Sequence, residues 1–278
     1  MTFPAQPEPQ VIRTADGNEQ SAVRGSGTEF FSPLYTYAFF LQPAPGLLPF
    51  IRQTEGIQRS VQVFSPAGSR IAAAVEPMPD PELLQVSDEV LVRSALRHDQ
   101  VICRLFAQMP VLPLRFGTCF LSAEKLGSHL LSRQAEYEQA LATIGGRAEY
   151  CLKGRVQPRT PSRWREQPQP ESQPSLSGTA YLLARKQAYL QQRQAQEQQE
   201  QEQQALQQLW PSTWPVQRVD PQPGEALRLY FLLTSAEWEA AAQLTQTWLA
   251  QHPHWQLDWS APLPPYHFVR ALREADKG

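Results

Sequence analysis

The 278-residue sequence predicts an α+β protein of two domains, of which the C-terminal one is ferredoxin-like and carries a long polar helix. Short apolar segments with strand character alternate with longer segments that repeat apolar residues every three or four positions. In the second half of the chain these segments follow the order β-α-β-β-α-β, which is the split βαβ arrangement. Hydrophobic residues make up 41% of the chain, enough to fill two cores.

Changes in composition give the expected domain boundaries. Residues 1–30 are polar and rich in Pro and Gln, which predicts a disordered N-terminal tail. An N-terminal α+β domain is expected over 31–145 and the ferredoxin-like domain over 146–278. Within the second domain, residues 157–177 hold five prolines and are expected to form a solvent-exposed loop.

The first domain is expected to begin with three strands. Residues 34–41 are apolar on both faces, which predicts a central strand. Residues 59–64 and 70–75 are separated by a Pro-Ala-Gly turn and should form a hairpin.

Two helices and a further strand complete this domain. The first helix is expected to begin after Ser87, whose side chain can cap it, and to end before Pro110. Residues 111–120 are expected to form an edge strand. The second helix should run from Ser122 to the glycine pair at 145–146.

Six elements are expected in the second domain. Its second helix should have Ser235 as N-cap, with Glu237 and Glu239 in the first turn. The expected elements are a strand at 148–156, a helix at 179–209, strands at 214–219 and 227–233, a helix from 235 and a strand at 255–259.

The first helix of this domain has an unusual composition. Residues 187–208 include 12 glutamines, and no apolar side chain larger than alanine lies between Leu190 and Leu206. Because Gln, Ala, Glu and Arg favour helices, we expect an exposed helix about 45 Å long. Part of it should project from the domain or contact another molecule.

Charge, cysteines and hydropathy exclude several classes of protein. A formal net charge of −2 argues against nucleic acid as a partner. Cys103, Cys119 and Cys151 are odd in number and far apart, which predicts reduced thiols in the cytoplasm. No apolar stretch approaches the about 18 residues of a membrane span, so no lipid membrane is expected as a partner.

No catalytic, cofactor-binding or metal site is predicted, and we expect no enzyme activity. His98 and Asp99 are adjacent in a helix and point in different directions, so they do not form an acid–base pair. His252 and His254 have no third ligand nearby in the sequence. Cys119 lies among phenylalanines, where a buried, inert thiol is expected.

Two segments are candidates for partner binding or for a structural role. The first is Val111 to Thr118, which places the guanidinium of Arg115 beside Phe116 in an apolar strand. Arg115 must reach the surface, pair with a carboxylate or bind an anion, and we favour structural pairing.

The second candidate is the C-terminal segment, in which prolines fix an extended backbone around Tyr266 and Phe268. In an extended chain these two aromatic side chains face the same side. We favour packing of both against the second domain over binding to a partner.

These motifs resemble those of the gas vesicle protein GvpF/GvpL family. The resemblance covers most of residues 34–272 and is most specific at Leu112-Pro-Leu-Arg-Phe-Gly-Thr118 and Pro262-Leu-Pro-Pro-Tyr-His-Phe268. It also includes Tyr35-Thr-Tyr-Ala38, residues 71–75, His98-Asp99-Gln100-Val101, Gly146-Arg-Ala-Glu149 and residues 178–186.

The resemblance implies a non-enzymatic, cytoplasmic protein of gas vesicle formation, either a minor vesicle component or an assembly factor. Its partners would be the small hydrophobic shell protein, whose nucleation it helps and whose aggregation it prevents, and other gas vesicle proteins. The residues alone leave an alternative, a small-ligand-binding or enzymatic ferredoxin-like protein with Arg115 as anion anchor. An RNA-binding sheet is disfavoured because residues 227–233 lack the required aromatic pattern.

Overall fold

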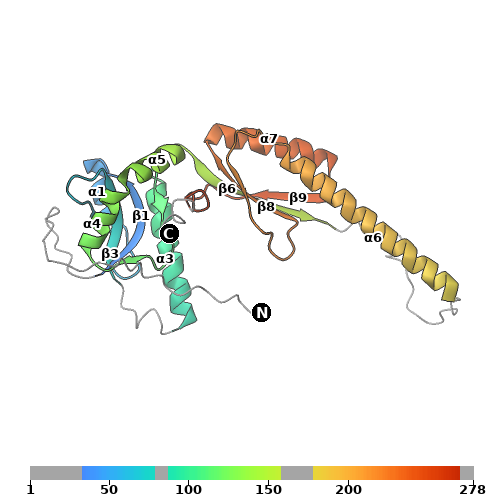
Figure 1. Ribbon diagram of the computed structural model, residues 1–278, viewed down its shortest axis with the longest axis horizontal. Helices are drawn as coiled ribbons and strands as arrows, with labels where there is room; N and C mark the ends of the chain where they lie inside the picture. Colours follow the sequence, from blue (N-terminus) through green and yellow to red (C-terminus); the bar gives the residue numbers. More distant parts are fainter. Residues whose placement is uncertain (1–32, 79–86, 158–177, 270–278) are drawn as a thin grey trace. The chain divides into compact units, whose positions relative to one another are not determined.

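The computed structural model describes residues 33–78, 87–157 and 178–269 (Figure 1). The tail expected at 1–30 and nearly all of the loop expected at 157–177 lie outside the described residues. The chain divides into two compact units, Tyr150–Ala261 and the remainder. The C-terminal segment from Pro262 therefore belongs to the first unit, whereas we expected it in the second domain.

The first unit contains an antiparallel sheet with the strand order β2-β3-β1-β4, in which β5 also pairs with β1. The prediction of a central first strand is thus confirmed. The expected strand at 111–120 is instead two short strands separated by a turn. The strands are β1 (Leu34–Leu41), β2 (Gln62–Phe64), β3 (Ile71–Pro77), β4 (Leu112–Pro113) and β5 (Cys119–Phe120).

Helices of the first unit follow the predicted pattern with two differences. Ser87 caps the first long helix as predicted, accepting a hydrogen bond from the backbone of Val90 at 3.3 Å. The expected second helix is broken at Arg133, where the backbone leaves helical geometry (φ −112°, ψ 16°). A proline-initiated helical segment after β1 was not expected. The helices are η1 (Pro45–Leu47), α1 (Leu48–Arg52), α3 (Asp88–Phe106), α4 (Ala123–Ser132) and α5 (Gln134–Ile144).

A β-bulge in β1 changes the face of the sheet to which its later side chains point. The register against β3 shifts between Thr36 and Ala38, which leaves Tyr37 as an extra residue. Tyr35 and Tyr37 both contact His98 of α3. Phe39 would share that face in a regular strand, but the bulge turns it toward the aromatic side chains of α4 and α5.

The second unit has the predicted element order β-α-β-β-α-β and a sheet with the order β7-β8-β6-β9. Helices α6 and α7 lie on one face of this sheet, and α6 extends beyond the strands (Figure 1). The elements are β6 (Ala148–Val156), α6 (Gly178–Gln207), β7 (Val216–Arg218), β8 (Leu227–Leu233), α7 (Ser235–Gln251) and β9 (Trp255–Trp259).

The cap of α7 differs by one residue from the prediction. Thr234, not Ser235, is the N-cap: its backbone is extended, and its side chain accepts a hydrogen bond from the backbone N–H of Glu237 at 3.3 Å. Glu237 in turn accepts from the backbone N–H of Thr234 at 2.8 Å, which completes a capping box.

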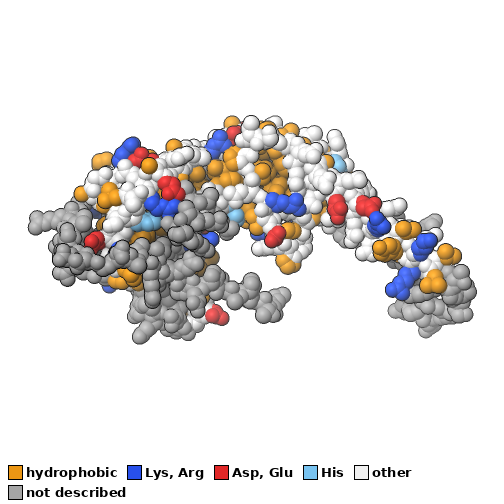
Figure 2. Space-filling view, in the orientation of Figure 1, with side chains coloured by type: hydrophobic (Ala, Val, Ile, Leu, Met, Phe, Trp, Pro, Cys, Tyr) orange, Lys and Arg blue, Asp and Glu red, His pale blue; other side chains and the backbone are white. Residues whose placement is uncertain are grey.

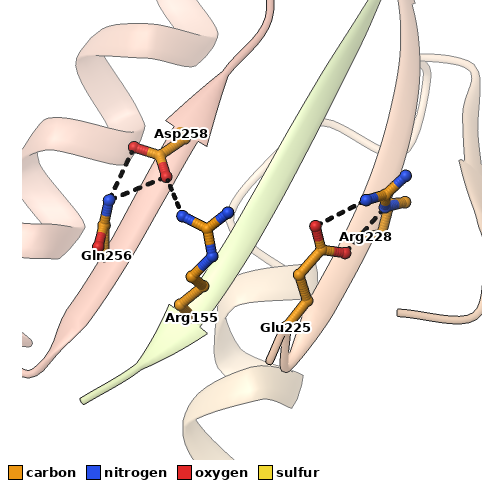
Figure 3. A network of polar contacts seen from close by, with 5 residues as sticks. All are labelled: Arg155, Glu225, Arg228, Gln256 and Asp258. Carbon is orange, nitrogen blue, oxygen red and sulfur yellow. Dashed lines mark hydrogen bonds and ion pairs between the residues drawn. The ribbon is translucent and has the colours of Figure 1, made fainter. Parts of the chain in front are cut away.

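Polar side chains pair on the strands of this sheet (Figure 3). Arg155 of β6 donates to Asp258 of β9 at 3.1 Å. Arg228 of β8 donates two hydrogen bonds, of 2.6 and 2.8 Å, to Glu225. These bonds from Arg228 lower the pKa of Glu225 to about 2.

Candidate interaction site at helix α3

The turn between β4 and β5 carries Arg115. Both the backbone N–H and the hydroxyl of Thr118 donate to the carbonyl oxygen of Arg115, at 3.1 and 2.7 Å. Gly117 closes the turn with a φ of 85°, a conformation that side-chain-bearing residues rarely adopt. Strand β4 ends at Pro113, so Arg115 follows the strand instead of lying within it.

The favoured interpretation of Arg115 as a buried, paired cation is wrong. Its side chain is exposed, and among the described residues its guanidinium has no hydrogen-bond or ion-pair partner. The Arg115 side chain instead reaches the surface, the first of the three possibilities for this residue.

His98 of α3 fixes this turn from beneath. Its Nε2 lies 3.0 Å from the carbonyl oxygen of Leu114, and its Nδ1 lies 2.8 Å from the hydroxyl of Tyr35. Burial raises the pKa of Tyr35 well above its usual value. Because the Leu114 carbonyl oxygen can only accept, Nε2 carries the proton and donates to it, and Nδ1 of the neutral ring accepts from the Tyr35 hydroxyl. The Tyr35 hydroxyl also accepts from the backbone of Gly117 at 3.2 Å.

Phe116 is the second candidate residue in the turn. Its ring lies edge-on to those of His98 and Tyr35, with centroids 5.8 and 6.3 Å away, and is partly buried against the core of the first unit. Phe116 thus helps to hold the turn while Arg115 is displayed outward.

The C-terminal segment docks on the first unit. Leu263 and Glu149 exchange two backbone hydrogen bonds, of 3.0 and 2.8 Å. The hydroxyl of Tyr266 donates to Asp99 of α3 at 2.9 Å, and its ring packs against the core. His98 and Asp99 therefore bind different partners, as expected from their directions.

The expected extended conformation at Tyr266 and Phe268 is wrong. Residues 266–269 form a turn, in which the backbone N–H of Val269 donates to Pro265 at 3.2 Å. The two aromatic side chains therefore do not share one side of an extended chain. Phe268 is half-buried, and Val269 is the buried anchor.

Glu149 and His267 form a clasp that sequence reasoning missed. The Glu149 side chain is only 1% exposed and accepts hydrogen bonds of 2.7 Å from both the backbone N–H and Nδ1 of His267. Both residues lie in segments already singled out by motif. A carboxylate at the start of an apolar strand was the available signal, because such a group needs partners once buried.

Glu76 is a second buried carboxylate that was missed. It accepts hydrogen bonds from the Tyr37 hydroxyl at 2.6 Å and from the backbone of Ile57 and Arg59 at 3.0 and 2.9 Å. Gly56 is required for this approach, since a Cβ there would lie 2.7 Å from a Glu76 oxygen. Glu76 thus ties the loop before β2 to the sheet.

The remaining sequence candidates have structural partners. His252 Nδ1 lies 2.9 Å from the Trp248 carbonyl oxygen, and His254 Nε2 lies 2.7 Å from Glu202. No cluster of three possible metal ligands occurs within the described ranges. Cys119 is buried as predicted, and burial raises its pKa to about 12, so the thiol is protonated at neutral pH.

Helix α3 thus contacts both predicted motifs, the Arg115 turn and the C-terminal segment. Consecutive residues of α3 hold the Arg115 turn and the C-terminal segment, and Phe116 and Tyr266 pack against the same core. The arrangement displays a cationic side chain on an anchored turn, which suits recognition of a partner surface. None of the described helices is long and apolar enough to cross a membrane.

Comparisons with known proteins agree with this fold. A family model described as gas vesicle synthesis protein GvpL/GvpF matches residues 33–270. The crystal structure of GvpF from Anabaena sp. PCC7120 is similar with a TM-score of 0.61 and 18% identity, over 86% of this chain and 98% of that chain. The crystal structure of GvpF from Microcystis aeruginosa is similar with a TM-score of 0.58 and 16% identity, over 86% of this chain and 99% of that chain. No curated protein matches the sequence.

Proposed function

Because the chain belongs to the gas vesicle synthesis protein GvpL/GvpF family, we propose that it acts in gas vesicle formation by binding the small hydrophobic shell protein. Family membership over residues 33–270 is the observation that carries this proposal. The protein would be a cytoplasmic, non-catalytic assembly factor or a minor component of the vesicle, in contact with other gas vesicle proteins.

The proposed role has a physical basis in the shell protein's hydrophobicity. A small subunit with a large apolar surface aggregates in water unless that surface is covered. A chaperone-like partner that covers it until incorporation would prevent aggregation and help nucleation of the shell. Such a partner needs exposed surface with fixed geometry, and the anchored turn at Arg115 supports this requirement.

We propose Arg115 and Phe116 as partner-binding residues and Tyr266 and Phe268 as structural ones. Arg115 is exposed and Phe116 half-buried on a turn held by His98, whereas Tyr266 is bonded within the first unit. The alternative, a ligand-binding or enzymatic protein with Arg115 as anion anchor, is disfavoured because no described polar group converges on that guanidinium.

We also propose that the second unit is ferredoxin-like. Its element order β-α-β-β-α-β and its sheet order β7-β8-β6-β9 support this assignment. The expected division into domains is retained with one change, namely that the C-terminal segment joins the N-terminal domain.

Co-purification tests the proposed function. The affinity-tagged chain is co-expressed with the shell protein, and we expect soluble shell protein in the eluate in excess of that recovered with an unrelated tagged protein. Equal recovery with both would contradict the proposal. Washing isolated vesicles with urea then separates the two roles: a minor vesicle component stays with the shell, and an assembly factor is absent or removed.

A further inference from the structure

We infer that the exposed N-terminal half of α6 is a docking surface for an amphipathic helix of the shell protein. In that docking helix, carboxylates border the apolar face. This inference rests on the proposed function and adds a surface on the second unit to the partner-binding turn proposed at Arg115. Its basis is the contrast between the two halves of α6.

The C-terminal half of α6 is fixed to its own sheet. Leu206 is completely buried. Glu202 accepts a hydrogen bond from the Trp255 indole at 2.8 Å and lies 2.7 Å from His254 Nε2. Gln203 donates to the Ala226 carbonyl oxygen at 3.0 Å. This half of the helix is therefore part of the second unit's fold.

The other half carries four large apolar side chains in solvent. Leu182, Leu183, Tyr189 and Leu190 are 45–64% exposed. The two pairs are seven residues apart, about two turns of helix, so all four lie on one face. We call this set the apolar stripe. Figure 2 shows hydrophobic side chains interleaved with Lys and Arg at the end of α6 away from the sheet.

The apolar stripe faces away from the protein's own core. Lys186 lies in the middle of the stripe, 20 residues before Leu206. At about 100° per residue, the two positions point about 160° apart. Extension of the second unit's sheet would therefore not cover the stripe, and nothing in the described part of the chain does so.

Charge identifies the chemistry of the occupant. Residues 178–196 contain no Asp or Glu, whereas Lys186 lies within the stripe and Arg185 at its edge. Arg193 already pairs with Glu197 at 2.9 Å. A helix with apolar residues flanked by carboxylates matches this pattern, because its apolar face covers the stripe and its acids meet the two cations.

The size of the stripe predicts transient binding. Residues 182–193 span about 18 Å of helix, and one helix docked along that length buries less than the about 1,200 Å² of a stable interface. Reversible binding suits a protein that holds a subunit and then releases it to a growing shell.

Paired variants test the inference. Leu183→Gln with Leu190→Gln removes two of the four apolar side chains of the stripe and retains residues that favour helices. Ala188→Gln with Ala195→Gln introduces the same side chains at the same spacing on the opposite face. The shell protein is the probe in the co-purification assay. We expect the leucine variant to recover at least about tenfold less shell protein than wild type, and the alanine variant to recover as much as wild type. Circular dichroism checks that both remain helical.

The charge component is tested separately. Arg185→Gln with Lys186→Gln should reduce capture and make the remainder less sensitive to salt, because ions screen the attraction that these cations supply.

Other outcomes overturn the inference. If Leu183→Gln with Leu190→Gln captures as much shell protein as wild type, the stripe is not the docking surface, and the proposed function stands. If wild type captures none, both fall. If light scattering shows a wild-type dimer that this variant converts to a monomer, the occupant is a second copy of the chain.

Discussion

Buried polar residues decide which segments of the first unit are held in place. Glu76 fixes the loop before β2, His98 the turn at Arg115, and Glu149 the C-terminal segment. Each is at most 3% exposed, so loss of its partners would leave a polar group without water or a hydrogen bond. Buried polar residues thus hold these three segments in place on the first unit.

Because Arg115 is exposed, substituting it tests partner binding without a large change in stability. We expect Arg115→Ala to change the free energy of unfolding by no more than about 0.5 kcal/mol, since no described partner is left unpaired. Urea denaturation measures this change, and co-purification measures loss of the shell protein. A loss of several kcal/mol would instead indicate that Arg115 has a structural partner.

The lowered pKa of Glu225 predicts that the free energy of unfolding depends on pH. Its hydrogen bonds from Arg228 lower its pKa from 4.5 to about 2, so its contribution is complete above pH 4.5 and is lost as the pH falls toward 2. At pH 7, Glu225→Gln should cost about 2–3 kcal/mol, and the difference from wild type should shrink below pH 4.5. Urea denaturation at several pH values measures it, with the exposed Glu239→Gln as control. A pH-independent difference would contradict this account.

Single positions show where sequence reasoning succeeds and where it fails. Ser87 was predictable as a cap because it is a capping residue that directly precedes the acidic first turn and apolar pattern of the helix. Thr234 and Ser235 are both capping residues, but only Thr234 has a glutamate three residues later, the spacing of a capping box, so Thr234 could have been predicted from the sequence. Arg115 was misread because its polarity suggested a buried pair, whereas the strand simply ends at Pro113.

Among the secondary-structure elements, α6 has two halves with different energetic roles. Glu202→Ala should lower stability by about 1–3 kcal/mol, because the buried Trp255 indole N–H loses its acceptor. Glu197→Ala, which removes only an exposed pair with Arg193, should cost about 0.5 kcal/mol or less. Denaturation followed by tryptophan fluorescence compares the two, and equal losses would contradict the division of the helix.

The C-terminal segment stabilises the first unit. Tyr266→Ala should cost about 2–4 kcal/mol, since the ring packs against the core and the hydroxyl bonds Asp99. Thermal denaturation measures the loss, with Pro262→Ala at an exposed position as control. An unchanged melting temperature for Tyr266→Ala would show that the docked segment contributes nothing to stability.

Element types were more predictable than element ends. Hydrophobic period identified β1, α3 and the β-α-β-β-α-β order, because these depend on local pattern. The two strands within 111–120 are joined by a turn that is held by contacts distant in sequence, such as His98 with Leu114. The clasp of Glu149 with His267 joins residues 118 positions apart and left no periodic signal.

For the molecule as a whole, family membership and surface chemistry lead to the same proposal. The anchored turn at Arg115 belongs to the first unit and the apolar stripe to the second, so the two surfaces that we propose for partner binding lie in different units. Neither surface was predictable in full from the sequence, because exposure depends on which side of α6 packs against the sheet and on where β4 ends.

Suppression of shell-protein aggregation is the most direct test of the proposed role. The shell protein is diluted from denaturant, and light scattering is followed with and without an equimolar amount of this protein. The account predicts that wild type suppresses the rise in scattering, while Leu183→Gln with Leu190→Gln suppresses it much less and Ala188→Gln with Ala195→Gln behaves as wild type. Scattering that rises equally with and without the wild-type protein would contradict the account.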